Sequence, residues 1–137
     1  MNNHVIQKFR TKEGYMTPIF KDYDAWHENH EVKMVYTTSM SLHSVKGPIV
    51  HTKRDSLVTA ISGVVMLVTE VNGIKEEIML RDRAGKSILA KIIAGVPAQY
   101  KCMSAEGIIL CMPNIAWHEK TDDSVKFDNW EEYNLSK

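Results

Sequence analysis

The sequence has only two cysteines, Cys102 and Cys111, and neither belongs to a Cys-x-x-Cys pair. This scarcity excludes a disulfide-stapled scaffold and a cysteine-based zinc site. We expect two reduced thiols in a protein core, with a disulfide between facing strands as the alternative. No apolar run approaches the roughly 20 residues that cross a bilayer, so we expect no membrane partner. Residues 1–4 carry no basic region followed by an apolar stretch, which predicts a cytoplasmic protein.

The chain also lacks an excess of charge of either sign. Lysine plus arginine number 17, and aspartate plus glutamate number 17, in 137 residues. A balanced surface produces no global field that would recruit nucleic acid, so we expect no nucleic-acid partner. The length predicts a single domain, residues 1–137, with a substantial core.

Short apolar runs with period-two alternation dominate the chain, which is typical of β-strands. Asn72-Gly73 between two such runs is a strong hairpin signal, and Gly63 suits a tight connection or bulge. Pro18 would confine the first run to a sheet edge. The polar tail after Pro113 predicts a loop with one short helical turn. The runs predict an all-β antiparallel double sheet or jelly roll, and they cover residues 15–20, 32–38, 57–62, 64–71, 74–80, 88–93, 99–103 and 108–112.

The most informative stretch is 46–54, where His51 lies among three cations on an extended segment. Imidazole titrates near neutral pH, so a histidine carried inward by a β-barrel can serve as an acid or base. A histidine satisfied by a backbone carbonyl is the structural alternative.

Several segments in order resemble the cupin-fold enzymes that act on nucleotide-linked 4-keto-6-deoxyhexoses, the dTDP-4-dehydrorhamnose 3,5-epimerases and the smaller 3,4-ketoisomerases. The segment 13–16 stands where the epimerases carry Arg-Gly-aromatic, and 32–36 resembles the ketoisomerase pattern Ile-Lys-Arg-Val-Tyr. Residues 46–51 resemble Arg-Gly-x-His-x-His, 93–98 resemble Pro-x-Gly-x-x-His, and 127–133 resemble the closing Asp-Asn-aromatic stretch. The resemblance implies an RmlC-like cupin, an antiparallel double-stranded β-helix with a short C-terminal tail.

Several family positions are substituted in this chain. Ile49 replaces the first histidine of the pair, Ala98 replaces the later histidine, and Cys111 falls where the epimerases use a tyrosine as proton donor. Glu13 and Met34 replace the two arginines. Among the acid/base groups implied by the resemblance, only His51 and Tyr36 remain.

The resemblance implies that His51 acts as the base and that Tyr36 donates a proton to the oxygen or to the opposite face. Lys53 and Arg54 are candidates for the nucleotide pyrophosphate, because guanidinium and ammonium groups bind phosphate oxygens. Strand alternation predicts that Lys53 faces inward with His51 and that Arg54 faces away. Tyr100 is a candidate to stack on a base or line the pocket, with a plain core position as the alternative.

A metal site needs several converging histidine or carboxylate ligands, and the substitutions at Ile49 and Ala98 oppose one. His27 and His30 lie in an acidic, loop-like segment, and residues 117–119 are expected at a surface or interface. We therefore expect no metal and no cofactor.

The resulting hypothesis is a sugar-nucleotide isomerase or epimerase of deoxysugar or surface-polysaccharide synthesis. It would bind a nucleotide sugar, with dTDP as the expected nucleotide, and form a homodimer through its N-terminal third. The alternative is a non-catalytic cupin that binds a sugar or nucleotide sugar. A dioxygenase-like metal cupin is a third reading, which the missing ligands oppose.

Overall fold

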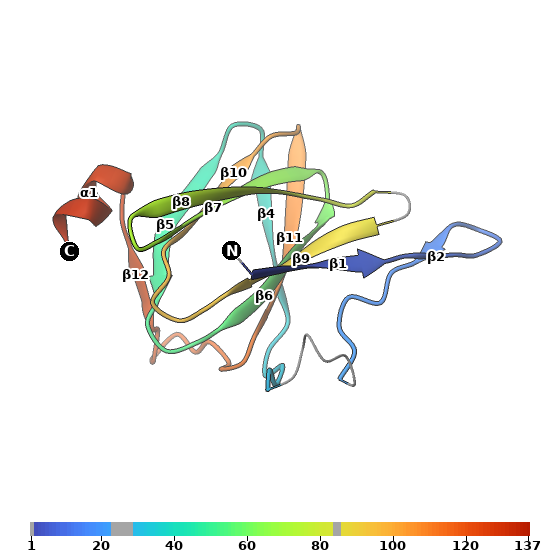
Figure 1. Ribbon diagram of the computed structural model, residues 1–137, viewed down its shortest axis with the longest axis horizontal. Helices are drawn as coiled ribbons and strands as arrows, with labels where there is room; N and C mark the ends of the chain where they lie inside the picture. The colour runs from blue at the N-terminus through green and yellow to red at the C-terminus, as the bar shows by residue number, and fades with distance from the viewer. Residues whose placement is uncertain (1, 23–28, 84–85) are drawn as a thin grey trace.

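The structure is a computed structural model that describes residues 2–22, 29–83 and 86–137. Two five-stranded antiparallel sheets form its body (Figure 1), in the orders β1-β9-β6-β11-β4 and β12-β5-β10-β7-β8, and β2 pairs with β3 in a separate hairpin. The strands are β1 (Asn2–Gln7), β2 (Phe9–Arg10), β3 (Tyr15–Met16), β4 (Tyr36–Ser41), β5 (Val45–His51), β6 (Ser56–Ser62), β7 (Val64–Val71), β8 (Ile74–Arg81), β9 (Lys86–Ile92), β10 (Ala98–Cys102), β11 (Glu106–Pro113) and β12 (Ser124–Lys126), and the helix is α1 (Trp130–Leu135).

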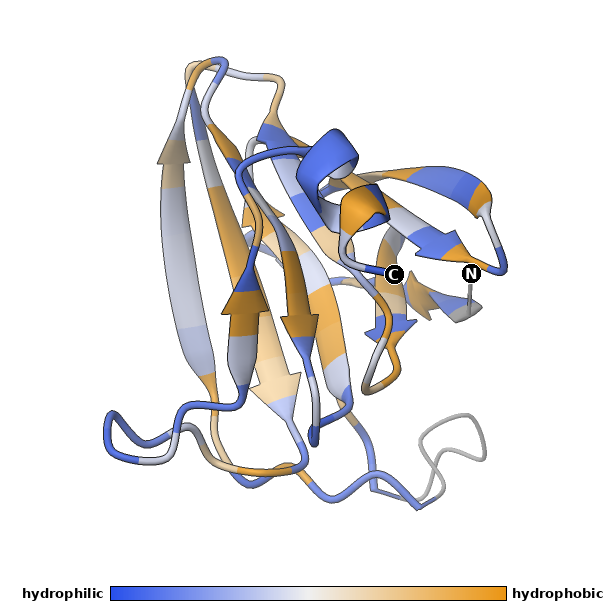
Figure 2. Ribbon diagram, turned by 90° about the vertical axis from the view of Figure 1, so that its left-hand side faces the viewer, coloured by the Kyte–Doolittle hydropathy of each residue, from blue (hydrophilic) through white to orange (hydrophobic). Residues whose placement is uncertain are grey.

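The main core lies between the two sheets, because alternate residues of each strand point inward. Val58 and Ile109 from one sheet pack with Leu67 from the other, and Cys102 and Cys111 are buried there as free thiols. Hydrophobic bands run across neighbouring strands of the sheets (Figure 2). This arrangement confirms the predicted all-β antiparallel double sheet and the reduced cysteines, and the disulfide alternative is wrong.

Two glycine-containing turns determine the course of the chain as the sequence predicted. Asn72 and Gly73 both have positive φ, 53° and 78°, and close the β7–β8 hairpin. Gly63 has φ of 71° and is the only residue between β6 and β7, which belong to different sheets. A Cβ atom at Gly63 would lie 2.0 Å from the carbonyl oxygen of Glu106, so the crossing requires glycine.

The N-terminal part differs from the prediction. The strand predicted over 15–20 is limited to β3, and one edge of the first sheet is β1, which was not predicted. Ile19 and Phe20 instead pack on a second apolar cluster with Leu57 and Leu89, on the outer face of that sheet. The burial of these side chains competes with strand pairing, and Pro18 supplies no N–H for a ladder.

The second predicted run, 32–38, also begins later than expected, since β4 starts at Tyr36. Val32 packs against the second apolar cluster, and the Lys33 amide donates to the carbonyl of Pro113.

The C-terminal tail contains the predicted helical turn and one strand that was not predicted. Helix α1 begins after Asn129, whose side chain accepts from the Glu132 amide, and Trp130 donates from Nε1 to Oε1 of Gln99 at 3.0 Å. Strand β12 pairs with β5 along its whole length. None of the helical structure in the described residues has the length and apolar character needed to span a bilayer.

Candidate active site

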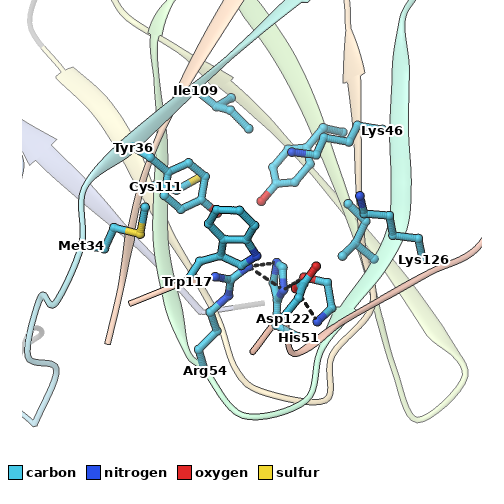
Figure 3. A pocket seen from close by; sticks show the side chains of 13 residues that line it. Met34, Tyr36, Lys46, His51, Arg54, Ile109, Cys111, Trp117, Asp122 and Lys126 are labelled. Carbon is cyan, nitrogen blue, oxygen red and sulfur yellow. Dashed lines mark hydrogen bonds between the residues drawn. The ribbon is translucent and has the colours of Figure 1, made fainter. Parts of the chain in front are cut away.

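A cavity of about 340 Å³ opens between the two sheets and is lined by side chains of β4, β5, β10, β11 and β12. Its walls combine cationic groups with aromatic and aliphatic side chains (Figure 3). This volume is in the usual range for small-molecule sites. Three of the substituted family positions, Met34, Ile49 and Cys111, line the cavity and make parts of its wall apolar.

A register shift in β5 turns three of its side chains into the cavity. In the pairing of β5 with β10, Ala98 lies opposite Ile49. Tyr100 is two residues after Ala98 on β10, but it lies opposite Lys46, which is three residues before Ile49 on β5. The extra residue reverses the alternation, so Lys46 lines the cavity together with Ile49 and His51.

Polar groups surround the His51 ring at the cavity wall. Arg54 donates from Nη2 to Nδ1 of His51 at 2.9 Å, and the Ser124 hydroxyl lies 3.0 Å from the same atom. An Asp123 carboxylate oxygen is 4.0 Å from Nδ1 and 3.5 Å from Nε of Arg54. Because arginine has no acceptor, Nδ1 accepts in this pair, and the neutral ring carries its proton on Nε2.

The surroundings keep His51 neutral. Burial and the Arg54 guanidinium lower the pKa of His51 to about 4, against a smaller opposing effect of Asp123. The imidazole is therefore unprotonated at physiological pH, as a base must be, although its proton affinity is low.

Tyr36 and Cys111 are direct cross-strand partners on β4 and β11, and both side chains line the cavity. Burial raises the pKa of both groups. The Tyr36 phenol therefore remains a hydrogen-bond donor, and neither group ionises readily.

Arg54 is an anion-binding candidate by its position. Its side chain is only 4% exposed and lines the cavity, and Nη1 has no hydrogen-bond partner among the described residues. A buried guanidinium nitrogen without a partner is unfavourable until an acceptor occupies the cavity.

The structure brings together four of the five predicted site residues, His51, Tyr36, Arg54 and Tyr100. The predicted orientation of the two cations is wrong: Lys53 is exposed and Arg54 faces the cavity. The reason is that β5 ends at His51 and the chain bends at residues 52–53, so strand alternation no longer applies.

Several cavity residues were not predicted as site residues. Lys46 was part of a quoted motif, but only the register shift directs it inward. Ser124 and Lys126 reach the cavity because β12 pairs Ser124 with His51 and Lys126 with Ile49. Trp117, expected at a surface or interface, is 42% exposed and contributes to the wall.

The described residues contain no cluster of three or more histidine, cysteine or acidic side chains that could hold a metal ion. His30 is buried and its Nε2 lies 2.9 Å from the carbonyl oxygen of Met112, which is a structural role. His27 lies outside the described residues.

The two facing antiparallel sheets, with the cavity between them, define this protein as an RmlC-like cupin. Residues 1–133 match the family described as FdtA: WxcM-like, C-terminal, and the chain belongs to that family. The resemblance seen in the sequence is thereby confirmed. No curated protein matches the chain by sequence.

Solved structures with the same fold cover nearly the whole chain. A His-to-Asn mutant of the 3,4-ketoisomerase QdtA from Thermoanaerobacterium thermosaccharolyticum, in complex with TDP-4-keto-6-deoxyglucose, is 19% identical with a TM-score of 0.71, over 98% of this chain and 93% of that one. A 3,4-ketoisomerase from Helicobacter canadensis is 12% identical with a TM-score of 0.73, over 99% and 97% of the two chains. A dTDP sugar isomerase from Desulfovibrio desulfuricans is 11% identical with a TM-score of 0.78, over 91% and 83%.

Proposed function

We propose that this protein is a sugar-nucleotide isomerase that removes a proton next to the ketone of a dTDP-linked 4-keto-6-deoxyhexose. Its place would be in cytoplasmic deoxysugar or surface-polysaccharide synthesis. The observation that carries the proposal is the neutral His51 imidazole in a cavity between the sheets, beside a buried guanidinium and opposite a phenol that stays protonated. Solved relatives of the same fold that carry ketoisomerase names support it.

His51 would take the proton from the carbon beside the ketone, and the electron pair of that bond would become the carbon–carbon double bond of an enolate. Negative charge then develops on the ketone oxygen, where the Tyr36 hydroxyl can donate a hydrogen bond. A positioned base of this kind typically contributes about 10²–10⁴-fold to a rate. The ketone shift is favoured over epimerisation because Cys111, with its raised pKa, stands where the epimerases have a tyrosine.

Arg54 is proposed to bind the diphosphate, and this would also prepare the base. In the structure, Arg54 Nη2 donates a hydrogen bond to the lone pair of His51 Nδ1. A phosphate that draws Arg54 away would let Nδ1 carry a proton toward Ser124 or Asp123, which leaves Nε2 free to accept the substrate proton.

The test is incubation with dTDP-4-keto-6-deoxyglucose in D2O, followed by NMR of the sugar protons. We expect exchange at C3 and migration of the ketone. His51→Asn should abolish both while TDP binding persists, because a base acts mainly in the transition state. His43→Asn is the matched control: His43 is exposed, and its φ of 65° suits asparagine.

The second candidate is a cupin that binds the nucleotide sugar without reacting. The low pKa of His51 and the apolar substitutions at Ile49, Ala98 and Cys111 favour it. TDP binding by wild-type protein without exchange at any sugar carbon would establish this alternative and refute the isomerase.

A further inference from the structure

Lys46 is a cationic residue that lines the cavity. The register shift of β5 directs its side chain inward, and Figure 3 shows its ammonium group toward the cavity interior. The residue is half-buried, and no carboxylate of the described part of the chain lies within ion-pair distance of it.

The groups around Lys46 come from four other elements or loops. Tyr100 of β10 is its register partner, Cys111 of β11 and Lys126 of β12 lie near it, and Arg54 adds a further positive charge. Burial is the main cause of a lowered pKa for Lys46, and the two cations act in the same direction while Cys111 opposes them. The amine form is therefore more accessible at neutral pH than for a lysine in water.

A ketone shift moves two protons, one between carbons and one between oxygens, and His51 accounts only for the first. The second requires a group that can both give and take a proton. Tyr36 and Cys111 are poor shuttles because burial raises the pKa of each. The Arg54 guanidinium does not release a proton in proteins. Lys46 meets the requirement by position and by chemistry.

We infer that Lys46 is a second catalytic residue, the acid and base that carries the proton between the two oxygens of the reacting sugar. This inference rests on the proposed isomerase function. His51 removes the C3 proton while Lys46 protonates O4, which gives a neutral enediol. The amine of Lys46 then removes the proton from O3, the double-bond electrons take the proton of His51 at C4, and the ketone forms at C3. Both side chains return to their starting states.

The experiment compares Lys46→Met and Lys46→Arg with Lys101→Met, an exposed lysine on β10 that serves as the control. Exchange at C3 in D2O and migration of the ketone are measured separately on dTDP-4-keto-6-deoxyglucose, and TDP binding and thermal melting report folding. Lys46→Met should slow ketone migration by about 10²-fold or more, within the usual range for general acid–base catalysis. Exchange should fall less, so that the ratio of exchange to migration rises.

Lys46→Arg separates proton transfer from charge. Arginine keeps the positive charge that stabilises the enolate but does not shuttle a proton, so exchange should recover and migration should stay slow. Any of three results would overturn the role of Lys46 without touching the proposed isomerase function. They are ketone migration restored in Lys46→Arg, migration within threefold of wild type in Lys46→Met, and an equal loss of exchange and migration in a folded Lys46→Met protein. Absence of exchange in the wild-type protein would refute the isomerase, and the role of Lys46 with it.

Discussion

Arg54 donates a hydrogen bond to Nδ1 of His51 at 2.9 Å, so the cation proposed to bind the diphosphate also lowers the pKa of the proposed base. The two residues are three positions apart, one at the end of β5 and the other beyond the bend at residues 52–53. If Arg54 binds the diphosphate as proposed, this contact couples ligand binding to proton transfer.

The first prediction concerns the pH dependence of catalysis. His51 must be neutral to accept a proton, and its pKa in the free protein is about 4. The profile of kcat/KM should therefore lose activity only as pH falls toward 4, because that profile reports the free enzyme. Initial rates across pH 3.5–8, with stability checked at each pH, test this. An acid limb near 6.5, the ordinary value for histidine, would contradict it.

The second prediction is that TDP raises the pKa of His51. If the phosphates draw Arg54 away, one cause of the lowered pKa is removed, while the opposing effect of Asp123 remains. NMR titration of the His51 ring with and without TDP measures the change. A pKa of His51 that is unchanged or lower with TDP would rule out the proposed movement of Arg54.

A third prediction compares two lysines, Lys126 and Lys53, as binding residues for TDP. Lys126 lines the cavity, whereas Lys53 is exposed outside it. Lys126→Met should weaken TDP binding by roughly 3- to 10-fold, about 0.7–1.4 kcal/mol, and less at high salt. Lys53→Met should leave affinity within about twofold, as for most surface charges. Calorimetry at two salt concentrations decides between them, and the reverse ranking would favour the original assignment of Lys53.

The fourth prediction uses two glycines with similar backbone conformations. Gly63 and Gly73 have φ of 71° and 78°, but a Cβ would meet the Glu106 carbonyl at the first and nothing within 4 Å at the second. Gly73→Ala should destabilise the folded protein by about 1–2 kcal/mol, which is the cost of a positive φ for a residue with a Cβ atom. Gly63→Ala should add a steric penalty of roughly 1–3 kcal/mol. Urea unfolding of both variants measures the difference, and equal midpoints would show that the crossing between the sheets tolerates a side chain.

The fifth prediction is a homodimer that involves the N-terminal third. Strand β1 is an edge of its sheet, and the β2–β3 hairpin projects from the body on the side away from α1 (Figure 1). Phe9, Tyr15 and Met16 on this hairpin are 43–55% exposed, and such an edge is usually covered. Light scattering at micromolar concentration should give twice the chain mass. A monomer there would refute the dimer, and Tyr15→Lys is expected to weaken it.

The sequence alone determined the fold class and much of the strand pattern, because period-two burial and turn residues are local properties. The runs over β6, β7 and β8 and the Asn72-Gly73 turn were read nearly to the residue. Strand β1 and strand β12 escaped prediction because their short, mostly polar runs are stabilised by pairing with β9 and β5, which are distant in sequence.

At the site, the sequence identified His51, Tyr36, Arg54 and Tyr100, and the tertiary structure decided the directions of the side chains and added the remaining cavity residues. Alternation along β5 predicted an inward Lys53, but the strand ends at His51 and the following bend directs Arg54 into the cavity. The register shift against β10 turns Lys46 inward. These directions depend on where pairing with another strand starts, slips and stops, which side-chain periodicity within one segment does not specify.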